Sequence, residues 1–518
     1  MRKLLIGLVA ALLLVGVVSV AAYAQGNLRE YTGYQVMNLS STQSANVRVD
    51  YYGPSGVTPV CTKNLDPIPP GGSANVQQKT ENCGAAPLPD GVYSAVLSSD
   101  QPIAAVVGQV MSDPGTAGAI YKSPFSEYSG VSAGSRKVIL PELMSNWFGI
   151  DSLVRVQNTG NTTANISVQY YSGTLGGQPT GKPSIAAKTY TIPSFAAITL
   201  DQGQINADLA AESGQFQGKY LGSAVITGDQ PLAAVVNQTD PTKRVKYTYN
   251  GFGDADDAGT ELLAPAIFWQ WYNTLTSLAV QNTSTTNSVN VTITYTAGPG
   301  STDTSNGNAA GQTKQVTFPL GPGESSTRYE GSAGSSDLAT QFNRFGGSAR
   351  ITANGPVVAK VNQTQYTATN GQLPSGAYSA TPTNKLTTRV AVPLIQAGFY
   401  GFFTSLTCAN SSTTQAANIT VQYTSDSLSA RPNQSGQATH SIAPGGSYIV
   451  YEGQANGALA DIYKTGSPWW VDGARNIFNG SAFVTSSGPG IACTVNEVGT
   501  GTTDDNMYTY NGVGLATP

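Results

Sequence analysis

Four segments of the chain alternate strictly between apolar and polar residues. A period of two places every second side chain on the same face, which suits a half-buried strand and does not suit a helix. Each segment therefore predicts a strand that turns one apolar face toward a core. The four segments are 47–51 (VRVDY), 166–170 (ISVQY), 291–295 (VTITY) and 419–423 (ITVQY).

These strands belong to a longer pattern that recurs along the chain. Each is preceded by a short strand-like signature that ends in an asparagine, and the signatures recur at nearly equal steps. Turn signals follow at short spacing, and about seven strands fit into each copy, as in a two-sheet β-sandwich. The asparagines are Asn38, Asn158, Asn282 and Asn410.

The repeat predicts an all-β chain of four tandem β-sandwich domains. The 518 residues minus a leader of 24 leave 494, or about 124 residues for each domain, which is a usual size. The domains are expected at 25–136, 137–260, 261–388 and 389–518.

Residues 156–168 (VQNTGNTTANISV) resemble the opening strands of the immunoglobulin-like, adhesion-related repeats of bacterial and archaeal surface proteins. The resemblance covers two strands and a turn in each repeat. It implies immunoglobulin-like sandwiches that serve extracellular display, adhesion or envelope structure rather than a reaction. Three of the four units lack the tryptophan that packs on an intersheet disulfide in antibody domains.

The segment 1–24 has the pattern of a secretory signal peptide. Two basic residues precede an apolar run at 4–20, and Ala22-Tyr23-Ala24 offers the small residues that a signal peptidase needs. Cleavage there makes Gln25 the first mature residue, and no membrane insertion is expected afterwards. The run is only marginally long enough to span a bilayer, so a retained anchor is the alternative.

A short apolar segment with a proline recurs between the expected domains. The segment occurs three times, and four tandem domains need three linkers. Aromatic residues gather beside the copies, and aromatic surface in a free linker would be a liability. We therefore expect the domains to pack end to end in a semi-rigid rod, and a platform for sugar rings is the alternative. The segments are 138–141, 262–265 and 390–393, and the aromatic residues are Trp147, Phe148, Phe268, Trp269, Trp271, Tyr272, Phe399, Tyr400, Phe402 and Phe403.

Four cysteines in an exported chain predict two disulfides. Cys61 and Cys83 both lie in the first unit, and Cys408 and Cys493 both lie in the fourth, so pairing within each unit is expected. Cys408 and Cys493 occupy inward-facing strand positions, which favours a bridge between the two sheets. Buried free thiols are the alternative.

The low charge of the chain excludes some classes of function. Charged residues make up 11% of the sequence and the net charge is −4, so there is no basic stripe for a phosphate backbone and nucleic acid is not an expected partner. His440 is the only histidine, and no nucleophile motif accompanies it. We therefore expect a protein that is not an enzyme.

One acidic cluster is a candidate calcium site. Asp254, Asp256, Asp257 and Glu261 lie in and after a glycine-containing loop, and grouped carboxylates can hold Ca²⁺ between tandem β-domains. A solvated acidic loop is the alternative. No other cofactor is expected.

Two adjacent tryptophans are a candidate ligand contact. Trp469 and Trp470 stand in an insertion that only the fourth unit carries. Neighbouring residues of a strand point to opposite faces, so at least one of the two rings can be exposed as a contact for sugar, lipid or protein. The alternative is a loop that folds over the end of the sandwich.

Together these features indicate a secreted structural or adhesive protein of the cell surface. It is expected to contact itself or other cell-envelope proteins, in a surface layer, sheath or filament, where many weak contacts add up through avidity. The alternative function is an array of carbohydrate-binding modules that contact surface glycans.

Overall fold

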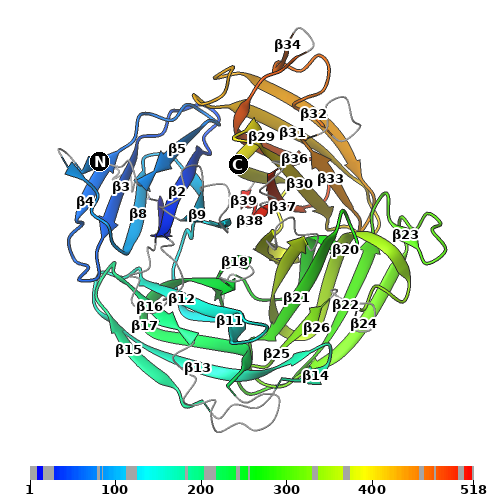
Figure 1. The fold of residues 1–518 in the computed structure, drawn as a ribbon, viewed down its shortest axis with the longest axis horizontal. Coiled ribbons are helices and arrows are strands. Elements are labelled where there is room, and N and C mark those ends of the chain that lie inside the picture. Colours follow the sequence, from blue (N-terminus) through cyan, green and yellow to red (C-terminus); the bar gives the residue numbers. More distant parts are fainter. Residues whose placement is uncertain are drawn as a thin grey trace, which may run out of the picture.

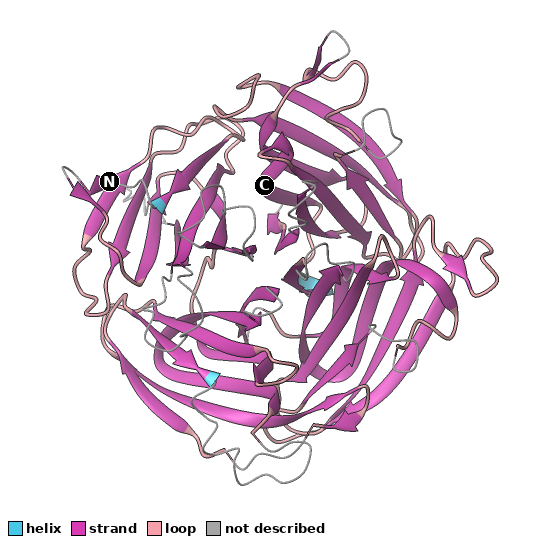
Figure 2. Ribbon diagram, in the orientation of Figure 1, coloured by secondary structure: helices cyan, strands magenta, loops and turns pink. Residues whose placement is uncertain are grey.

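The computed structural model describes residues 9–15, 29–78, 82–83, 86–112, 125–180, 185–202, 218–240, 245–254, 257–329, 336–365, 374–453, 460–471, 474–499 and 507–515. These residues form mainly antiparallel sheets, and Figure 2 shows strands almost throughout. The described part contains no α-helix, only short turns such as the 3-10 helix Thr383–Lys385. In this part no helix is long and apolar enough to cross a membrane. The expected all-β class is confirmed.

The strands fall into four successive units with one strand order. Counting the main strands and leaving out the short additional ones, each unit pairs its first, sixth, third and fourth strands in one row and its fifth, second, seventh and eighth strands in another. In the first unit the sheets are β1 (Val9–Val15), β8 (Tyr93–Ser99), β3 (Val47–Tyr52), β4 (Cys61–Asn64), and β5 (Ser73–Gln77), β2 (Arg29–Asn38), β9 (Ile103–Ser112), β10 (Phe125–Ser129). A small hairpin joins β6 (Asn82–Cys83) to β7 (Ala86–Pro87).

In the second and third units one long strand serves as both the sixth and the seventh strand. The second unit contains β11 (Ser135–Ser145), β12 (Asp151–Asn158), β13 (Ala164–Leu175), β14 (Gln178–Pro179), β15 (Lys188–Ile192), β16 (Ala197–Asp201), β17 (Tyr220–Asp240), β18 (Val245–Asn250) and β19 (Phe252–Gly253). The third contains β20 (Gly259–Trp269), β21 (Thr274–Asn282), β22 (Val289–Ala297), β23 (Thr302–Asp303), β24 (Thr313–Leu320), β25 (Ser325–Tyr329), β26 (Phe342–Gln365), β27 (Ser375–Ser379) and β28 (Thr381–Pro382).

The fourth unit again has separate sixth and seventh strands, and it carries an extra hairpin, β34–β35. Its strands are β29 (Arg389–Phe399), β30 (Phe402–Asn410), β31 (Ala417–Ser425), β32 (Ser435–Ile442), β33 (Ser447–Tyr451), β34 (Trp470–Val471), β35 (Ala474–Arg475), β36 (Phe478–Ser486), β37 (Ile491–Gly499), β38 (Met507–Asn511) and β39 (Val513–Leu515).

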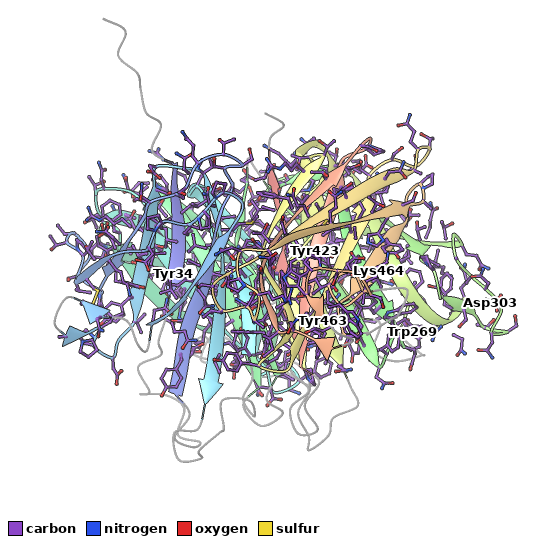
Figure 3. All side chains as sticks on the ribbon, turned by 90° about the horizontal axis from the view of Figure 1, so that it is seen from above. Tyr34, Trp269, Asp303, Tyr423, Tyr463 and Lys464 are labelled. Atoms are coloured by element: carbon purple, nitrogen blue, oxygen red, sulfur yellow. A yellow bond between two sulfur atoms is a disulfide. The ribbon has the colours of Figure 1, made fainter. Side chains whose placement is uncertain are left out.

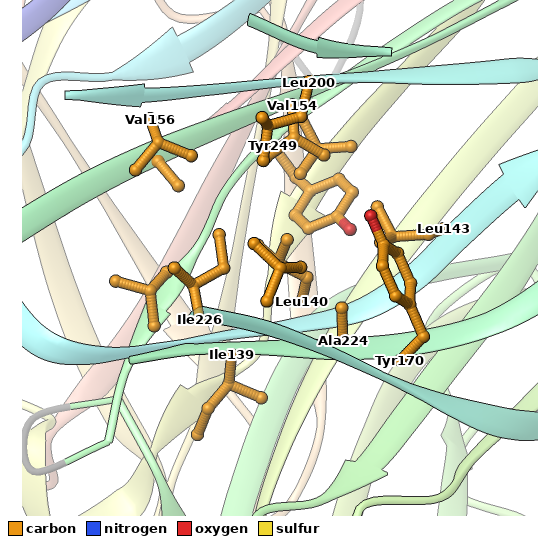
Figure 4. Close-up of a cluster of buried hydrophobic side chains, with 14 of the residues drawn as sticks. Ile139, Leu140, Leu143, Val154, Val156, Tyr170, Leu200, Ala224, Ile226 and Tyr249 are labelled. Carbon is orange, nitrogen blue, oxygen red and sulfur yellow. The ribbon is translucent and has the colours of Figure 1, made fainter. Parts of the chain in front are cut away.

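The alternating segments bury the faces that their pattern predicts. In β22, Val291, Ile293 and Tyr295 are buried, whereas Asn290 beside them is exposed. Each unit has its own large apolar cluster. Figure 4 shows part of the cluster of the second unit, where Leu140 of β11 lies between side chains of its neighbour β17, such as Ile226, and side chains of the facing strands, such as Tyr249.

The asparagine that ends the second strand of each unit holds the following turn in place. Asn158 is fully buried, its Nδ2 donates to the carbonyls of Thr162 (2.7 Å) and Ile192 (3.0 Å), and its Oδ1 accepts from the Gly160 amide (2.9 Å). Asn38, Asn282 and Asn410 make the corresponding bonds. The recurrence of asparagine therefore has a structural cause, since its short amide satisfies buried backbone groups locally.

The expected semi-rigid rod is wrong, because the first unit touches the fourth. Gln35 Nε2 donates to Asp426 Oδ2 (3.3 Å), and Ser481 Oγ donates to the Gly71 carbonyl (2.9 Å). Figure 1 shows the four units around a common centre, and Figure 3 shows the resulting disc from the side, with Tyr423 and Tyr463 in the fourth unit. The chain is a closed ring.

The segments expected to be linkers are strands, which explains why the chain does not extend. β11, β20 and β29 contain these segments, and each pairs with the sixth strand of its own unit. Residues 173–175 of β13 also pair in parallel with residues 325–327 of β25, so one 18-stranded sheet joins the second and third units. The domain boundaries themselves stay a prediction.

The eighth strands of the four units meet at the centre of the ring. β10, β18, β27 and β38 each contact the next around the circle, and β38 contacts β10. The Asn250 amide donates to the Ser129 carbonyl (2.8 Å), the Ser129 hydroxyl to the Asn511 carbonyl (2.9 Å), and the Asn511 amide to the Ser379 carbonyl (2.6 Å). Polar side chains on these strands therefore close the ring.

Candidate functional site

An exposed aromatic residue stands at the tip of the turn between the first and second strands of three units. Phe148, Tyr272 and Tyr400 are 62%, 65% and 63% exposed. Each ring lies edge-on to the aromatic residue before it, with centroids 5.9, 5.6 and 4.6 Å apart. The preceding residues are Trp147, Trp271 and Phe399.

The backbone of these tips is in the left-handed region. The φ angles are 55° at Phe148, 45° at Tyr272 and 48° at Tyr400, and the next residue of each turn also has a positive φ. A two-residue turn of this kind favours glycine, asparagine or aspartate, and a bulky residue there costs roughly 1–3 kcal/mol. The turns of three units therefore each hold an aromatic ring exposed in an unfavourable backbone conformation.

A cleft opens between the fourth unit and the first, beside the Tyr400 tip. Its volume is about 310 Å³, and Tyr400, Phe402, Tyr508 and Phe125 are among the aromatic residues that line it. The Tyr508 ring centroid lies 3.8 Å from that of Phe125 and 4.9 Å from that of Phe402. These rings form an aromatic wall.

Uncharged amides line the same cleft. Gln35, Asn75, Gln77 and Gln396 take part, and Asn75 Nδ2 donates to Gln35 Oε1 (3.1 Å). Aromatic faces together with convergent amides suit a neutral ligand rich in hydroxyl groups, because the rings cover its apolar faces and the amides bond its polar edges.

Glu127 is the one carboxyl side chain among the described residues that line this cleft. It is 3% exposed, and its Oε2 has no hydrogen-bond partner in the described part of the chain. Burial raises the pKa of Glu127 to about 8. Burial also raises the pKa of Glu497 in the fourth unit, and the charge of Glu127 adds to this rise. Burial thus disfavours the charged form of both carboxyls at the contact between the first and fourth units.

The protonated Glu127 makes stability fall as pH rises. Its usual pKa of 4.5 applies in the unfolded chain, so between about pH 4.5 and 8 the folded state keeps a proton that the unfolded state has lost. We expect Glu127→Gln to be more stable than the parent by roughly 1–4 kcal/mol at pH 8, and equal to it at pH 4. Urea unfolding at the two pH values measures this, and a gain of the same size at both would contradict it.

A second cleft opens between the third and fourth units, beside the Tyr272 tip. Its volume is about 540 Å³, and Trp271, Tyr272, Tyr448 and Tyr451 line it. The Arg344 guanidinium lies 5.1 Å from the centroid of the Trp271 ring. The two clefts are thus alike in position and in aromatic lining.

Of the two candidate tryptophans, Trp469 belongs to the core. It is 1% exposed, and its ring packs against Phe478 (4.8 Å between centroids) and Tyr423 (6.4 Å). Trp469 therefore offers no exposed ring for a ligand. Trp470 is half-buried against the same cluster, and its role in binding stays a prediction.

The acidic residues proposed for calcium make separate bonds. Asp254 pairs with Lys137 (3.2 Å), Glu261 pairs with Arg350, and Asp257 Oδ2 accepts from the Gly253 amide (2.7 Å). Asp256 lies outside the described residues. No three potential metal ligands gather in the described part of the chain, so the calcium site stays a prediction.

Both disulfides form within their units, as expected. One of them, however, joins two strands of the same sheet and not two facing sheets. Cys61 bonds to Cys83, and Cys408 bonds to Cys493. Cys408 of β30 and Cys493 of β37 lie opposite each other in neighbouring strands of one sheet, with their Cα atoms 4.1 Å apart. The bridge between sheets is therefore wrong, because two inward-facing positions can also be cross-strand neighbours.

A polar network in the fourth unit has no signal in the sequence pattern. His440 Nε2 lies 2.9 Å from Asp461 Oδ2, and the Tyr423 hydroxyl lies 2.8 Å from that oxygen and 2.9 Å from Glu452 Oε1. Burial, with Asp461 nearby, raises the pKa of Glu452 to about 8. The bonded partners are separated by 21 to 38 positions in the chain, so only the fold brings them together.

Comparison with family models, curated proteins and solved structures gives no match for this chain. Its function is therefore inferred from the geometry of the clefts.

Proposed function

We propose that this protein is an exported, adhesive protein of the cell surface. The observation that carries the proposal is the repeated display of an exposed aromatic tip in a strained turn, at Phe148, Tyr272 and Tyr400. Several weak contacts on one rigid ring add up through avidity. Two disulfides are compatible with an oxidising, extracellular compartment.

The proposal includes the organisation expected from the sequence. The leader 1–24 is removed during export, and the four units are tandem copies of one immunoglobulin-like sandwich. The common strand order of the four units supports the second point.

Binding of neutral glycans is the second candidate function. The cleft between the fourth and first units favours it, because aromatic rings and amides line it and its one described carboxyl is kept neutral. Sugar rings stack on aromatic faces, and their hydroxyl groups pair with amides.

Binding of the purified protein to isolated cell envelopes of the producing organism tests both candidates. We expect Tyr400→Ala to weaken binding about tenfold, since loss of one well-placed aromatic contact costs roughly 1.4 kcal/mol, and Tyr272→Ala with Tyr400→Ala to weaken it further. Tyr329→Ala is the matched control, because Tyr329 is 39% exposed and lines neither of the two clefts described.

Oxidation of the envelopes with periodate separates the two candidates. Periodate cleaves the vicinal diols of sugars, so loss of binding identifies a glycan, and unchanged binding identifies a protein surface. Equal binding by the double variant and the parent would refute the adhesive role of the tips.

A further inference from the structure

The first strand of the first unit comes from the apolar leader. In the other units the first strand, β11, β20 or β29, pairs with the sixth strand of its own unit. In the first unit this place beside β8 is held by β1, which contains residues 9–15. The other edge of β8 pairs with β3 along its length. The sheet is therefore complete only while β1 is present.

The register of β1 copies that of the other first strands. Leu13 lies opposite Ala95, and Ala11 lies opposite Leu97. The equivalent pairs are Leu140–Ala224 and Val138–Ile226, Ala264–Ala349 and Leu262–Ile351, and Val392–Ala482 and Val390–Val484. In those equivalent pairs every residue is at most 2% exposed. The place beside β8 is thus a core position that takes an apolar strand.

Removal of the leader leaves this place empty within the chain. Cleavage after Ala24 leaves only residues 25–28 before β2, and four residues reach at most about 14 Å. In the second unit the first strand spans Ser135–Ser145, and a turn separates it from the second strand, which begins at Asp151. The mature chain therefore lacks the length to rebuild such a strand and turn from residues before β2.

Exposure of the β8 edge to water is energetically unfavourable. Ala95 and Leu97 are fully buried in the structure, where β1 covers this edge. Without β1, backbone groups of β8 lose their partners, and an unpaired apolar edge pairs readily with another extended chain.

We propose that the edge of β8 is a strand-acceptor site, which takes an extended apolar segment of a partner chain after the leader is removed. The segment runs antiparallel to β8 and places uncharged small or aliphatic side chains opposite Ala95 and Leu97. Strand addition then links the ring to its neighbour in the envelope. The proposal rests on the export included in the proposed function, but not on the aromatic tips.

A peptide with the sequence of residues 135–142 (SRKVILPE) is a suitable probe, because these residues form most of the equivalent strand in the second unit and carry charges that aid solubility. The protein is the chain secreted by its own host, with Gln25 verified as its first residue by mass spectrometry. We expect one peptide to bind each chain and to slow hydrogen exchange of the amides at 93–99 by at least tenfold. The same peptide with Val138→Asp and Leu140→Asp is the control and should do neither.

A leader-retaining variant, Ala24→Leu, gives a matched protein control. Its β1 occupies the site, so the peptide should not slow exchange at 93–99. The proposal is overturned if the secreted chain keeps residues 9–15, or if its β8 amides are protected without peptide, or if both peptides bind equally. Such a result would not affect envelope binding that depends on Tyr400. The strand-acceptor proposal and the proposed function can therefore be refuted independently.

Discussion

Lys360→Ala is expected to lower the free energy of unfolding by about 3–5 kcal/mol, because it leaves a carboxylate buried without its cation. Lys360 Nζ lies 2.6 Å from Glu142 Oε2, and both side chains are fully buried between the second and third units. The ammonium group also donates to Gln238 Oε1 (2.5 Å) and lies 4.5 Å from the centroid of the Tyr249 ring. Glu142 keeps hydrogen bonds from Thr327 and Asn362, but these do not neutralise it.

Denaturant unfolding of matched variants measures this loss. Lys137→Ala removes a partly exposed ion pair with Asp254 and should change stability by less than about 1 kcal/mol. The double variant Lys360→Met with Glu142→Gln removes both charges, so it should recover much of the loss. If Lys360→Ala is as stable as the parent, the Lys360–Glu142 ion pair does not hold the two units together.

Glu30→Ala is expected to destabilise the protein by a similar amount, about 3–5 kcal/mol, because it leaves two buried cations without a counter-ion. Glu30 of the first unit accepts from Lys246 Nζ (2.5 Å) and Arg155 Nη2 (3.1 Å) of the second. The side chains of both cations are at most 2% exposed. Burial alone would raise the pKa of Glu30, but Lys246 and Arg155 together lower it below its usual value.

The lowered pKa of Glu30 fixes the direction of the pH dependence. Its stabilising effect is present above about pH 4.5 and is lost as pH falls through the lower folded pKa. The stability difference between Glu30→Ala and the parent should therefore shrink in acid, as unfolding curves at pH 7 and pH 3 would show. Glu261→Gln, at a partly exposed ion pair with Arg350, is the control. A pH-independent difference would contradict the role of the charge.

The contacts between units thus differ around the ring. The first and second units, and the second and third, are joined by buried ion pairs. The contact between the fourth and first units contains Glu127 and Glu497, two buried carboxyls whose pKa values are raised, besides the hydrogen bonds of Gln35 and Ser481. Because both shifts oppose ionisation, we expect rising pH to weaken this contact, which also borders the aromatic cleft beside Tyr400.

Local pattern predicts the strands and the partners of the cysteines, but not how the strands combine into sheets. Cys408 and Cys493 pair as expected, yet they face each other across neighbouring strands of one sheet. Periodicity reports which side of a strand is buried and not which strand lies beside it. The same limit explains why residues 138–141 resemble a linker in the sequence although they belong to β11.

The candidate clefts can be predicted only in part. The sequence identifies the aromatic residues of the turns. It leaves open whether they pack between domains or bind a ligand. Which of them are exposed depends on the turn conformation: Phe148 is exposed at the tip, whereas Trp147 beside it is buried. Glu127 has no signal in the sequence, because the cleft that it lines is completed by the fourth unit, which begins only at Arg389.

The sequence by itself determined the β-strands, their repetition and their buried faces, because a period of two and local asparagine and glycine turns act over a few residues. Only the tertiary structure decided that the units close into a ring, that the strand Val9–Val15 completes the first unit, and that aromatic clefts form between units. These features depend on contacts between residues far apart in the chain, which local periodicity does not encode.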